Sequence, residues 1–245
     1  MKKLVKTVGS HALRHRERLD KEWEKTDWTR KQAEQVLRRI DGILEQLPQA
    51  QRQAHERIIG ERAVKNEDKI LSLYEKETRI IVRGKMESEV EFGNTLLLAE
   101  QANGLIVDWK LYRESAPADS RLLAESIKRT EQLTTVRIKT VTADRGFDSI
   151  DNVQLLDERK IFNGICPKNP KRLTERNKER KFVQLQKRRA STEGRIGIIK
   201  NKFAGCPMRV RGFGRREVAV GWRVLAHNLW VLARLPLIEN LACAA

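Results

Sequence analysis

The stretch V-T-A-D-R-G-F-D at 141–148 constrains the fold of this chain more than any other. It ends an apolar run, which predicts a buried strand with Asp144 at its carboxyl end. Gly146 permits a tight turn directly after the aspartate, and residues 149–159 have the pattern of a helix. A further strand is predicted at 161–165. The chain therefore holds one carboxylate rigidly at the end of a strand, beside a glycine turn.

Short β-prone runs precede this unit, and a turn signal separates the last two. The runs lie at 69–74, 79–83, 91–100 and 105–112. Asn103-Gly104 stands between the final pair and is typical of a β-hairpin turn. The runs predict an antiparallel meander, and Pro117 and Asp119 open a helix after it. The order of meander, helix, strand, helix, strand and helix predicts an α/β (α+β) fold, with a mixed sheet flanked by helices.

Residues 1–66 form a strongly charged region with a helical pattern. Asp27 is predicted to cap a helix that ends at Pro48, with 49–64 as its partner helix. A solvated helical hairpin and a surface that follows DNA phosphates are both consistent with this pattern. The sequence leaves that choice open.

The last third of the chain contains a basic segment between predicted elements. Residues 167–181 are rich in Lys and Arg and lack apolar periodicity, which predicts a loop. A helix follows this loop, and a final helix at 216–235 is apolar on several sides. Trp222 and Trp230 on the final helix are expected to pack in the core.

The charge balance of the chain points to a polyanionic partner. Its 245 residues carry a net charge of +17, and 40% of them are apolar, enough for a core. Nucleic acid is the usual partner of such a chain, although a polybasic membrane-surface protein has a similar balance. No apolar run approaches the ~18 residues that a membrane span requires. The three cysteines have neither zinc-site nor disulfide spacing, which favours the reducing cytoplasm: Cys166, Cys206 and Cys243.

A second acidic motif, S-T-E-G-R-I-G-I-I-K at 191–200, suggests a chemistry. Glu193 and Lys200 are seven residues apart, two turns along one helix face. Carboxylates from different elements suit a hard cation such as Mg²⁺, and two such ions support phosphodiester cleavage. Each motif alone is more often structural, a turn or a surface ion pair. Their combination in a basic chain predicts a metal-dependent nuclease with Asp144 and Glu193 as catalytic residues and metal ligands.

These residues belong to a wider set of motifs, through which the chain resembles insertion-sequence DDE transposases, in particular the ISNCY-like group. The motifs are I-V-R-G-K at 81–85, E-F-G-N at 91–94, A-P-A-D-S at 116–120, A-D-R-G-F-D at 143–148, R-R-A-S-T-E-G-R-I-G at 188–197 and A-H-N-L-W at 226–230. The resemblance implies an RNase H-like catalytic domain with two Mg²⁺ (or Mn²⁺) ions. It also implies cleavage and strand transfer at transposon ends, with double-stranded DNA as partner and a homo-oligomeric enzyme.

Within this resemblance, Asp144 matches the second catalytic carboxylate and Glu193 the third, and Lys200 matches a basic position beyond it. The residues expected to contact DNA are Lys200, Arg188, Arg189, Arg195, Lys168, Lys171 and Arg172. This chain departs from the family's pattern at the first catalytic Asp. Such transposases carry that residue on the first, central strand of the sheet. The aspartates of the first helical region, Asp20, Asp27 and Asp41, stand in helical surroundings, so none of them fits.

The chain is therefore expected to be a C-terminal portion of a transposase. Residues 1–66 are predicted to be an insertion-like helical region, and 67–245 a catalytic domain that is incomplete at its first strand. Asp68 and Asp108 are the fallback candidates for a third carboxylate. The predicted activity is weak or absent transposase-type cleavage. A non-catalytic DNA-binding protein or transposition inhibitor is the alternative, and an RNA-binding protein is the third possibility.

Overall fold

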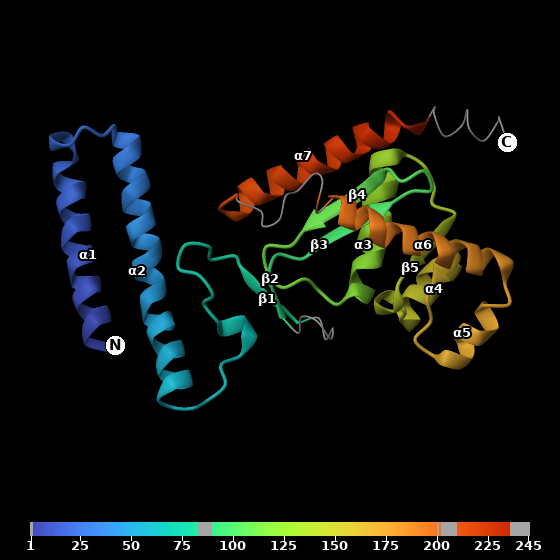
Figure 1. The fold of residues 1–245 in the computed structure, drawn as a ribbon, viewed down its shortest axis with the longest axis horizontal. Coiled ribbons are helices and arrows are strands. Elements are labelled where there is room, and N and C mark those ends of the chain that lie inside the picture. Colours follow the sequence, from blue (N-terminus) through green and yellow to red (C-terminus); the bar gives the residue numbers. More distant parts are fainter. Residues whose placement is uncertain (1, 83–89, 200, 202–209, 236–245) are drawn as a thin grey trace. The chain divides into compact units, whose positions relative to one another are not determined.

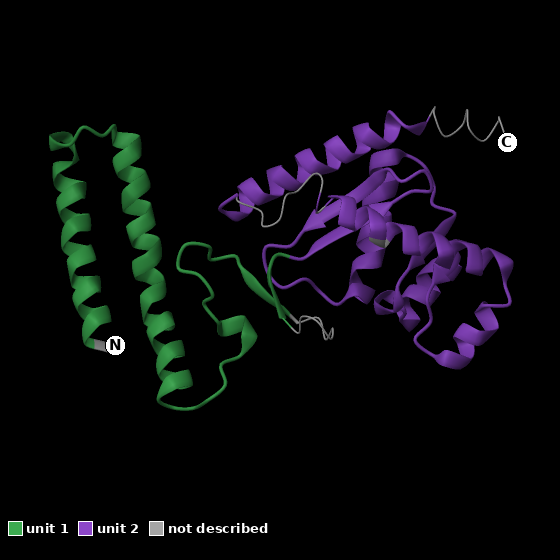
Figure 2. Ribbon diagram, viewed as in Figure 1, with its two compact units in different colours: residues 1–94 green, residues 95–245 purple. Residues whose placement is uncertain are grey.

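The computed structural model describes residues 2–82, 90–199, 201 and 210–235 (Figure 1). Lys200, Cys206 and Cys243 lie outside the described residues, as does most of the motif at 81–85. Long helices combine with short strands, so the predicted α+β class is confirmed. The chain divides into two compact units, Met1–Asn94 and Thr95–Ala245 (Figure 2). Within the described residues, no helix has the length and apolar character needed to cross a membrane.

The first unit is built on a helical hairpin of α1 (Lys2–Glu22) and α2 (Arg30–Ile58), joined through the short turn η1 (Trp23–Lys25). Arg16 of α1 donates to both carboxylate oxygens of Asp41 of α2, at 2.8 and 3.2 Å, which ties the helices together. This hydrogen-bonded pair also lowers the pKa of Asp41. The hairpin partner of α2 is therefore α1, and the predicted partner helix at 49–64 was wrong.

The start and the length of α2 also differ from the prediction. Thr29, not Asp27, caps the helix, because its hydroxyl accepts from the backbone N–H of Gln32 and the Gln32 side chain accepts from the N–H of Thr29. The helix then continues through Pro48 to Ile58. Proline removes one backbone donor, so the surrounding turns need other support to stay helical.

Glutamine side chains on both sides of Pro48 provide such support by binding the segment at 68–73. Gln46 donates to the Leu73 carbonyl at 3.1 Å and Gln49 to the Asp68 carbonyl at 2.8 Å. Gln53 accepts from the N–H of Ile70 at 2.7 Å and donates to its carbonyl. Because these side chains use its backbone groups, the run at 69–74 is not a strand as predicted. It follows the turn η2 (Asn66–Asp68) along α2.

Strands in the described residues form three separate pairs. Strands β1 (Arg79–Val82) and β2 (Val90–Gly93) pair antiparallel in the first unit. Strands β3 (Leu96–Glu100) and β4 (Ile106–Leu111) form the predicted hairpin, with Gly104 at φ +91 in its turn. Strands β5 (Thr140–Ala143) and β6 (Phe162–Ile165) pair in parallel. No ladder joins these pairs in the described residues, whereas one mixed sheet was expected.

Helix α3 (Asp119–Thr134) packs between the two strand pairs of the second unit. One side of α3 contacts β4 through Ser126 and Arg129. The other side places Leu123 and Ile127 in a core with Leu156 of α4 (Ile150–Glu158) and the β5–β6 pair. The helix therefore connects two ladders that share no backbone hydrogen bonds.

Helices α5 (Pro170–Arg176), α6 (Arg180–Ile198) and α7 (Phe213–Leu232) complete the second unit. The segment predicted as a loop contains α5, because Asn169 caps its first turn and Pro170 begins it. Helix α7 packs on β4, where the Asn228 side chain bonds both the N–H and the carbonyl of Ile106 at 2.9 Å. Trp222 of α7 is 67% exposed, so its predicted place in the core was wrong.

The parallel contact of β5 with β6 leaves no room for a side chain at Gly164. A Cβ there would lie 2.7 Å from the Val141 carbonyl oxygen and 3.1 Å from Leu185 Cδ1. Because backbone cannot yield as a side chain can, we expect Gly164→Ala to lower the free energy of unfolding by about 1–3 kcal/mol. Urea denaturation measures this change. Gly194→Ala is the control: a Cβ at Gly194 of α6 meets nothing within 4 Å, so alanine is expected to stabilise the helix.

Candidate active site

Asp144 is exposed and follows β5 directly, at the entrance to the single turn η3 (Arg145–Phe147). Its carboxylate accepts a hydrogen bond from the backbone N–H of Gly146 at 2.9 Å. This bond fixes the side chain to the turn and leaves acceptor capacity on the carboxylate for a cation. The predicted sequence of strand, aspartate, glycine turn and helix is thus observed.

The turn after Asp144 is held from two sides. Asn152 is almost fully buried, and its amide donates to the carbonyls of Phe147 at 2.7 Å and Ser120 at 2.8 Å. Lys168 binds Asp148 twice, through its backbone N–H and its ammonium group, both at 2.8 Å. Lys168, one of the predicted DNA-binding residues, therefore also fixes the turn.

Asp119, the first residue of α3, brings a second carboxylate to this turn. A Cβ built on Gly146 would lie 2.4 Å from Asp119 Oδ2 and 3.1 Å from Asp144 Oδ1, so these two oxygens are at most 5.5 Å apart. From the sequence, Asp119 was predicted only to begin a helix and was not among the candidate site residues. Its position in A-P-A-D-S, one of the motifs that carry the resemblance, was the available signal.

Glu193 lies in α6, and its side chain is outside the described part of the chain. Contacts of α6 advance along β6 in the direction of the strand: Lys181 covers the Phe162 ring at 4.1 Å, and Gln186 donates to the Gly164 carbonyl at 2.6 Å. Helix α6 therefore runs towards the carboxyl ends of β5 and β6. Glu193 is seven residues, about two turns, further along this helix than Gln186.

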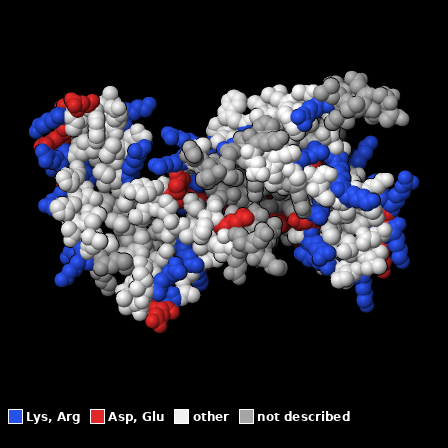
Figure 3. Space-filling view, in the orientation of Figure 1, with Lys and Arg blue, Asp and Glu red and all other residues white. Residues whose placement is uncertain are grey.

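The predicted DNA-binding residues fall into two groups. Arg188 and Arg195 of α6 lie within 3.9 and 3.6 Å of the Glu100 carboxylate on β3, so their charge is partly balanced there. Arg189 of α6 donates to Gln186 at 3.2 Å. Lys171 and Arg172 are exposed in the first turn of α5. The end of the second unit that holds α5 shows many Lys and Arg side chains and few acidic ones (Figure 3).

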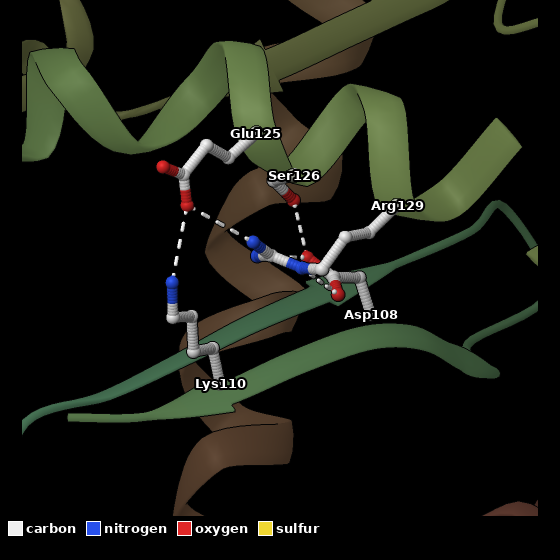
Figure 4. A network of polar contacts seen from close by, with 5 residues as sticks. All are labelled: Asp108, Lys110, Glu125, Ser126 and Arg129. Atoms are coloured by element: carbon white, nitrogen blue, oxygen red, sulfur yellow. Dashed lines mark hydrogen bonds and ion pairs between the residues drawn. The ribbon is translucent and has the colours of Figure 1, made fainter. Parts of the chain in front are cut away.

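The fallback carboxylate Asp108 has a different role. It is 3% exposed on β4 and accepts from Ser126 at 2.7 Å and twice from the Arg129 guanidinium, at 2.9 and 2.8 Å (Figure 4). The hydrogen bond with Asp108 raises the pKa of Arg129. Glu125 accepts from Lys110 at 3.1 Å on the exposed side of this network, and that bond lowers the pKa of Glu125. Asp108 is therefore a buried structural anion.

The other fallback, Asp68, belongs to η2 in the first unit and is exposed. Across the ranges that the structure describes, no group of three or more His, Cys, Asp or Glu side chains is arranged to hold a metal ion. At the Asp144 turn, two carboxylates lie close together, those of Asp144 and Asp119.

Comparison with known families identifies the domain formed by the second unit. The model of the transposase DDE domain matches residues 94–229, more than half of the chain and almost all of the described second unit. The chain belongs to this family of insertion-sequence DDE transposases, whose domain is RNase H-like and whose role is DNA binding and recombination in transposition. Members generally use divalent metals. Comparison with curated proteins and with solved structures gave no significant match.

A stability measurement distinguishes a structural role of Asp108 from a role as a metal ligand. We expect Asp108→Ala to lower the free energy of unfolding by about 2–4 kcal/mol, because Ser126 and Arg129 lose the buried carboxylate to which they donate. Asp151→Ala, at an exposed first-turn position of α4, is the matched control and is expected to change stability little. Equal stability of the two variants in chemical denaturation would contradict the structural role of Asp108.

Proposed function

We propose that the second unit carries out divalent-metal-dependent DNA cleavage and strand transfer at insertion-sequence ends. Asp144 and Glu193 are its catalytic carboxylates and metal ligands, as the resemblance implies, and Asp119 is an additional ligand. One observation carries the proposal: in a member of the DDE family, the Asp144 carboxylate at a strand end lies within 5.5 Å of a second carboxylate oxygen. Mg²⁺ is the proposed ion, with Mn²⁺ as its substitute.

The donor set fits such an ion. Asp119 and Asp144 supply hard carboxylate oxygens, which Mg²⁺ and Mn²⁺ prefer, and both residues are exposed, so a DNA strand and water can reach them. Glu193 on α6 adds a third carboxylate from a separate element. The course of α6 towards the carboxyl ends of β5 and β6 supports its approach to Asp144.

Each part of the chain then has a defined task. When bound, the metal activates the attacking water or hydroxyl and stabilises the leaving oxygen. Strand β5 and the N–H of Gly146 hold Asp144 in one orientation, and α3 holds Asp119 against the same turn. Lys171 and Arg172 at the start of α5 bind the phosphates of the DNA strand, which positions the scissile bond.

The proposed activity of this chain is weak. In the resembling transposases, the first catalytic aspartate is on a strand of the sheet. Among the described residues, Asp108 is the one aspartate that lies on a strand. Its carboxylate accepts hydrogen bonds from Arg129 and Ser126. The first ligand position of the family is therefore not supplied by a described strand. Asp119 approaches the turn from a helix instead.

Residues 1–66 are proposed as an insertion-like helical region that contributes to DNA binding. Many of the Lys and Arg side chains of α1 and α2 are exposed, and they are spaced along both helices. The proposed partner of the whole chain is double-stranded DNA, both transposon ends and target. Cytoplasmic location and self-association remain part of the proposal.

Cleavage and metal binding test the carboxylates. We expect weak nicking of supercoiled DNA with Mg²⁺ or Mn²⁺, abolished by Asp144→Asn and by Glu193→Gln. Calorimetric titration with Mn²⁺ should show at least about tenfold weaker binding for Asp144→Asn and Asp119→Asn, because each loses a charged ligand. Asp151→Asn is the control and should bind Mn²⁺ as the parent chain does.

The outcomes distinguish the parts of the proposal. Unchanged Mn²⁺ affinity in Asp144→Asn would refute the metal site. Unchanged affinity in Asp119→Asn alone would remove only that residue from the site. Robust strand transfer that depends on Asp144 would contradict the expectation of weak activity and leave the site assignment standing.

Salt dependence tests the DNA partner and the alternative function, a non-catalytic DNA-binding protein or transposition inhibitor. We expect DNA affinity to fall steeply with salt, and the pair Lys171→Ala and Arg172→Ala to reduce the slope of log K against log salt by about 1–2. Lys128→Ala, an exposed lysine in the middle of α3, should leave the slope unchanged. Tight DNA binding without any nicking under either metal would favour the alternative, and stronger retention of structured RNA would favour an RNA partner.

A further inference from the structure

Helix α6 is attached to the β3–β4 hairpin by polar contacts that meet at one carboxylate, that of Glu100 at the end of β3. The Thr192 hydroxyl donates a hydrogen bond to this carboxylate at 2.7 Å. The guanidinium groups of Arg188 and Arg195 lie within 3.9 and 3.6 Å of it. The Glu100 side chain is 12% exposed, so these three groups replace much of its contact with water.

The three partners of Glu100 lie on one face of α6. They are four and then three positions apart, which is two turns of helix. Two of them also contact the turn of the hairpin. Arg188 donates to the Gln101 carbonyl at 2.7 Å. A Cβ on Gly104 would lie 1.4 Å from Arg195 Nη1, so this guanidinium group occupies the space beside the turn.

An earlier part of α6 rests on the parallel strand pair, where Gln186 donates to the Gly164 carbonyl. The two strand pairs share no ladder in the described residues, so side chains of α6 join elements that backbone hydrogen bonds do not align. Glu193, the proposed third metal ligand, directly follows Thr192 in the chain. The hairpin contact therefore determines where the backbone of Glu193 lies, whereas β5 determines where Asp144 lies.

We infer that Glu100 is a positioning residue for the proposed metal site. With its three partners on α6, it sets the course of the helix and thereby the place from which Glu193 reaches the ion bound at Asp144. Glu100 has this task only if the proposed function is correct and Glu193 is a metal ligand. Arg188 and Arg195, which the sequence predicted as DNA contacts, then hold the helix instead of a phosphate.

Hydrogen exchange on the metal-free chain tests the attachment by itself. We expect Glu100→Ala to speed amide exchange roughly tenfold in residues 190–198, because its three partners on α6 lose the carboxylate that they share. Glu131→Ala is the matched control. Glu131 is 20% exposed and joins α3 to α4 through Arg159, so its loss should speed exchange in those helices and leave 190–198 unchanged. Unchanged exchange of 190–198 in Glu100→Ala overturns the inference.

Calorimetric titration with Mn²⁺ tests the consequence for the site. We expect about tenfold weaker binding for Glu100→Ala, as is typical when a residue that orients a metal ligand is removed. Glu100→Gln keeps an acceptor for Thr192 and should lose less, and Glu131→Ala should bind as the parent chain does. Glu193→Gln is the reference: if it binds Mn²⁺ as tightly as the parent, the proposed ligand is wrong, and the task of Glu100 with it. If only Glu100→Ala binds normally, the positioning role alone is wrong.

The salt dependence of DNA binding separates holding the helix from contacting a phosphate. Arg195→Ala should weaken Mn²⁺ binding and leave the slope of log K against log salt unchanged, whereas loss of a phosphate contact would lower the slope by about 1. Combining Arg195→Ala with Glu100→Ala should weaken Mn²⁺ binding little beyond Glu100→Ala, because both changes break the same contact. A lower slope with unchanged Mn²⁺ affinity in Arg195→Ala overturns the inference in favour of a DNA contact.

Discussion

The buried carboxylate of Asp108 fixes the second unit around helix α3. A carboxylate removed from water is costly unless charged and polar partners satisfy it, and Ser126 and Arg129 do so from adjacent turns of α3. This contact determines how α3 lies on β4. At the other end of the helix, Asn152 binds the Ser120 carbonyl. With both ends fixed, Asp119 is held against the Asp144 turn, about 15 Å of helix from Arg129.

The strand pairs explain why the proposed carboxylate site depends on this helix. Strands β4 and β5 share no ladder in the described residues, so backbone hydrogen bonds do not align the hairpin with the parallel pair. In the RNase H order, the first strand separates the meander from the later parallel strands and carries the first aspartate. In the part of the chain that the structure describes, the two ladders are not joined, and the one aspartate on a strand, Asp108, is engaged with Arg129 and Ser126. Helix α3 spans this break and supplies a carboxylate from its own first turn.

Local sequence signals predicted the elements whose ends depend on near neighbours. The Asn103-Gly104 turn, the strand that ends before Asp144 and the helix after Ser149 all follow from residues within a few positions. Predictions failed where distant side chains decide. Glutamines of α2 bind the backbone at 68–73 and so prevent a strand there. The approach of Asp119 to Gly146 is a contact between separate elements, which periodicity does not encode.

Strand β4 connects α3 and α7 through its two faces. Its alternating side chains point to opposite faces, so Asp108 binds α3 while Trp109 packs within 3.3 Å of the Cβ position of Gly221 on α7. The strand that determines how α3 lies, and with it the place of Asp119 beside the Asp144 turn, is therefore itself packed against α7.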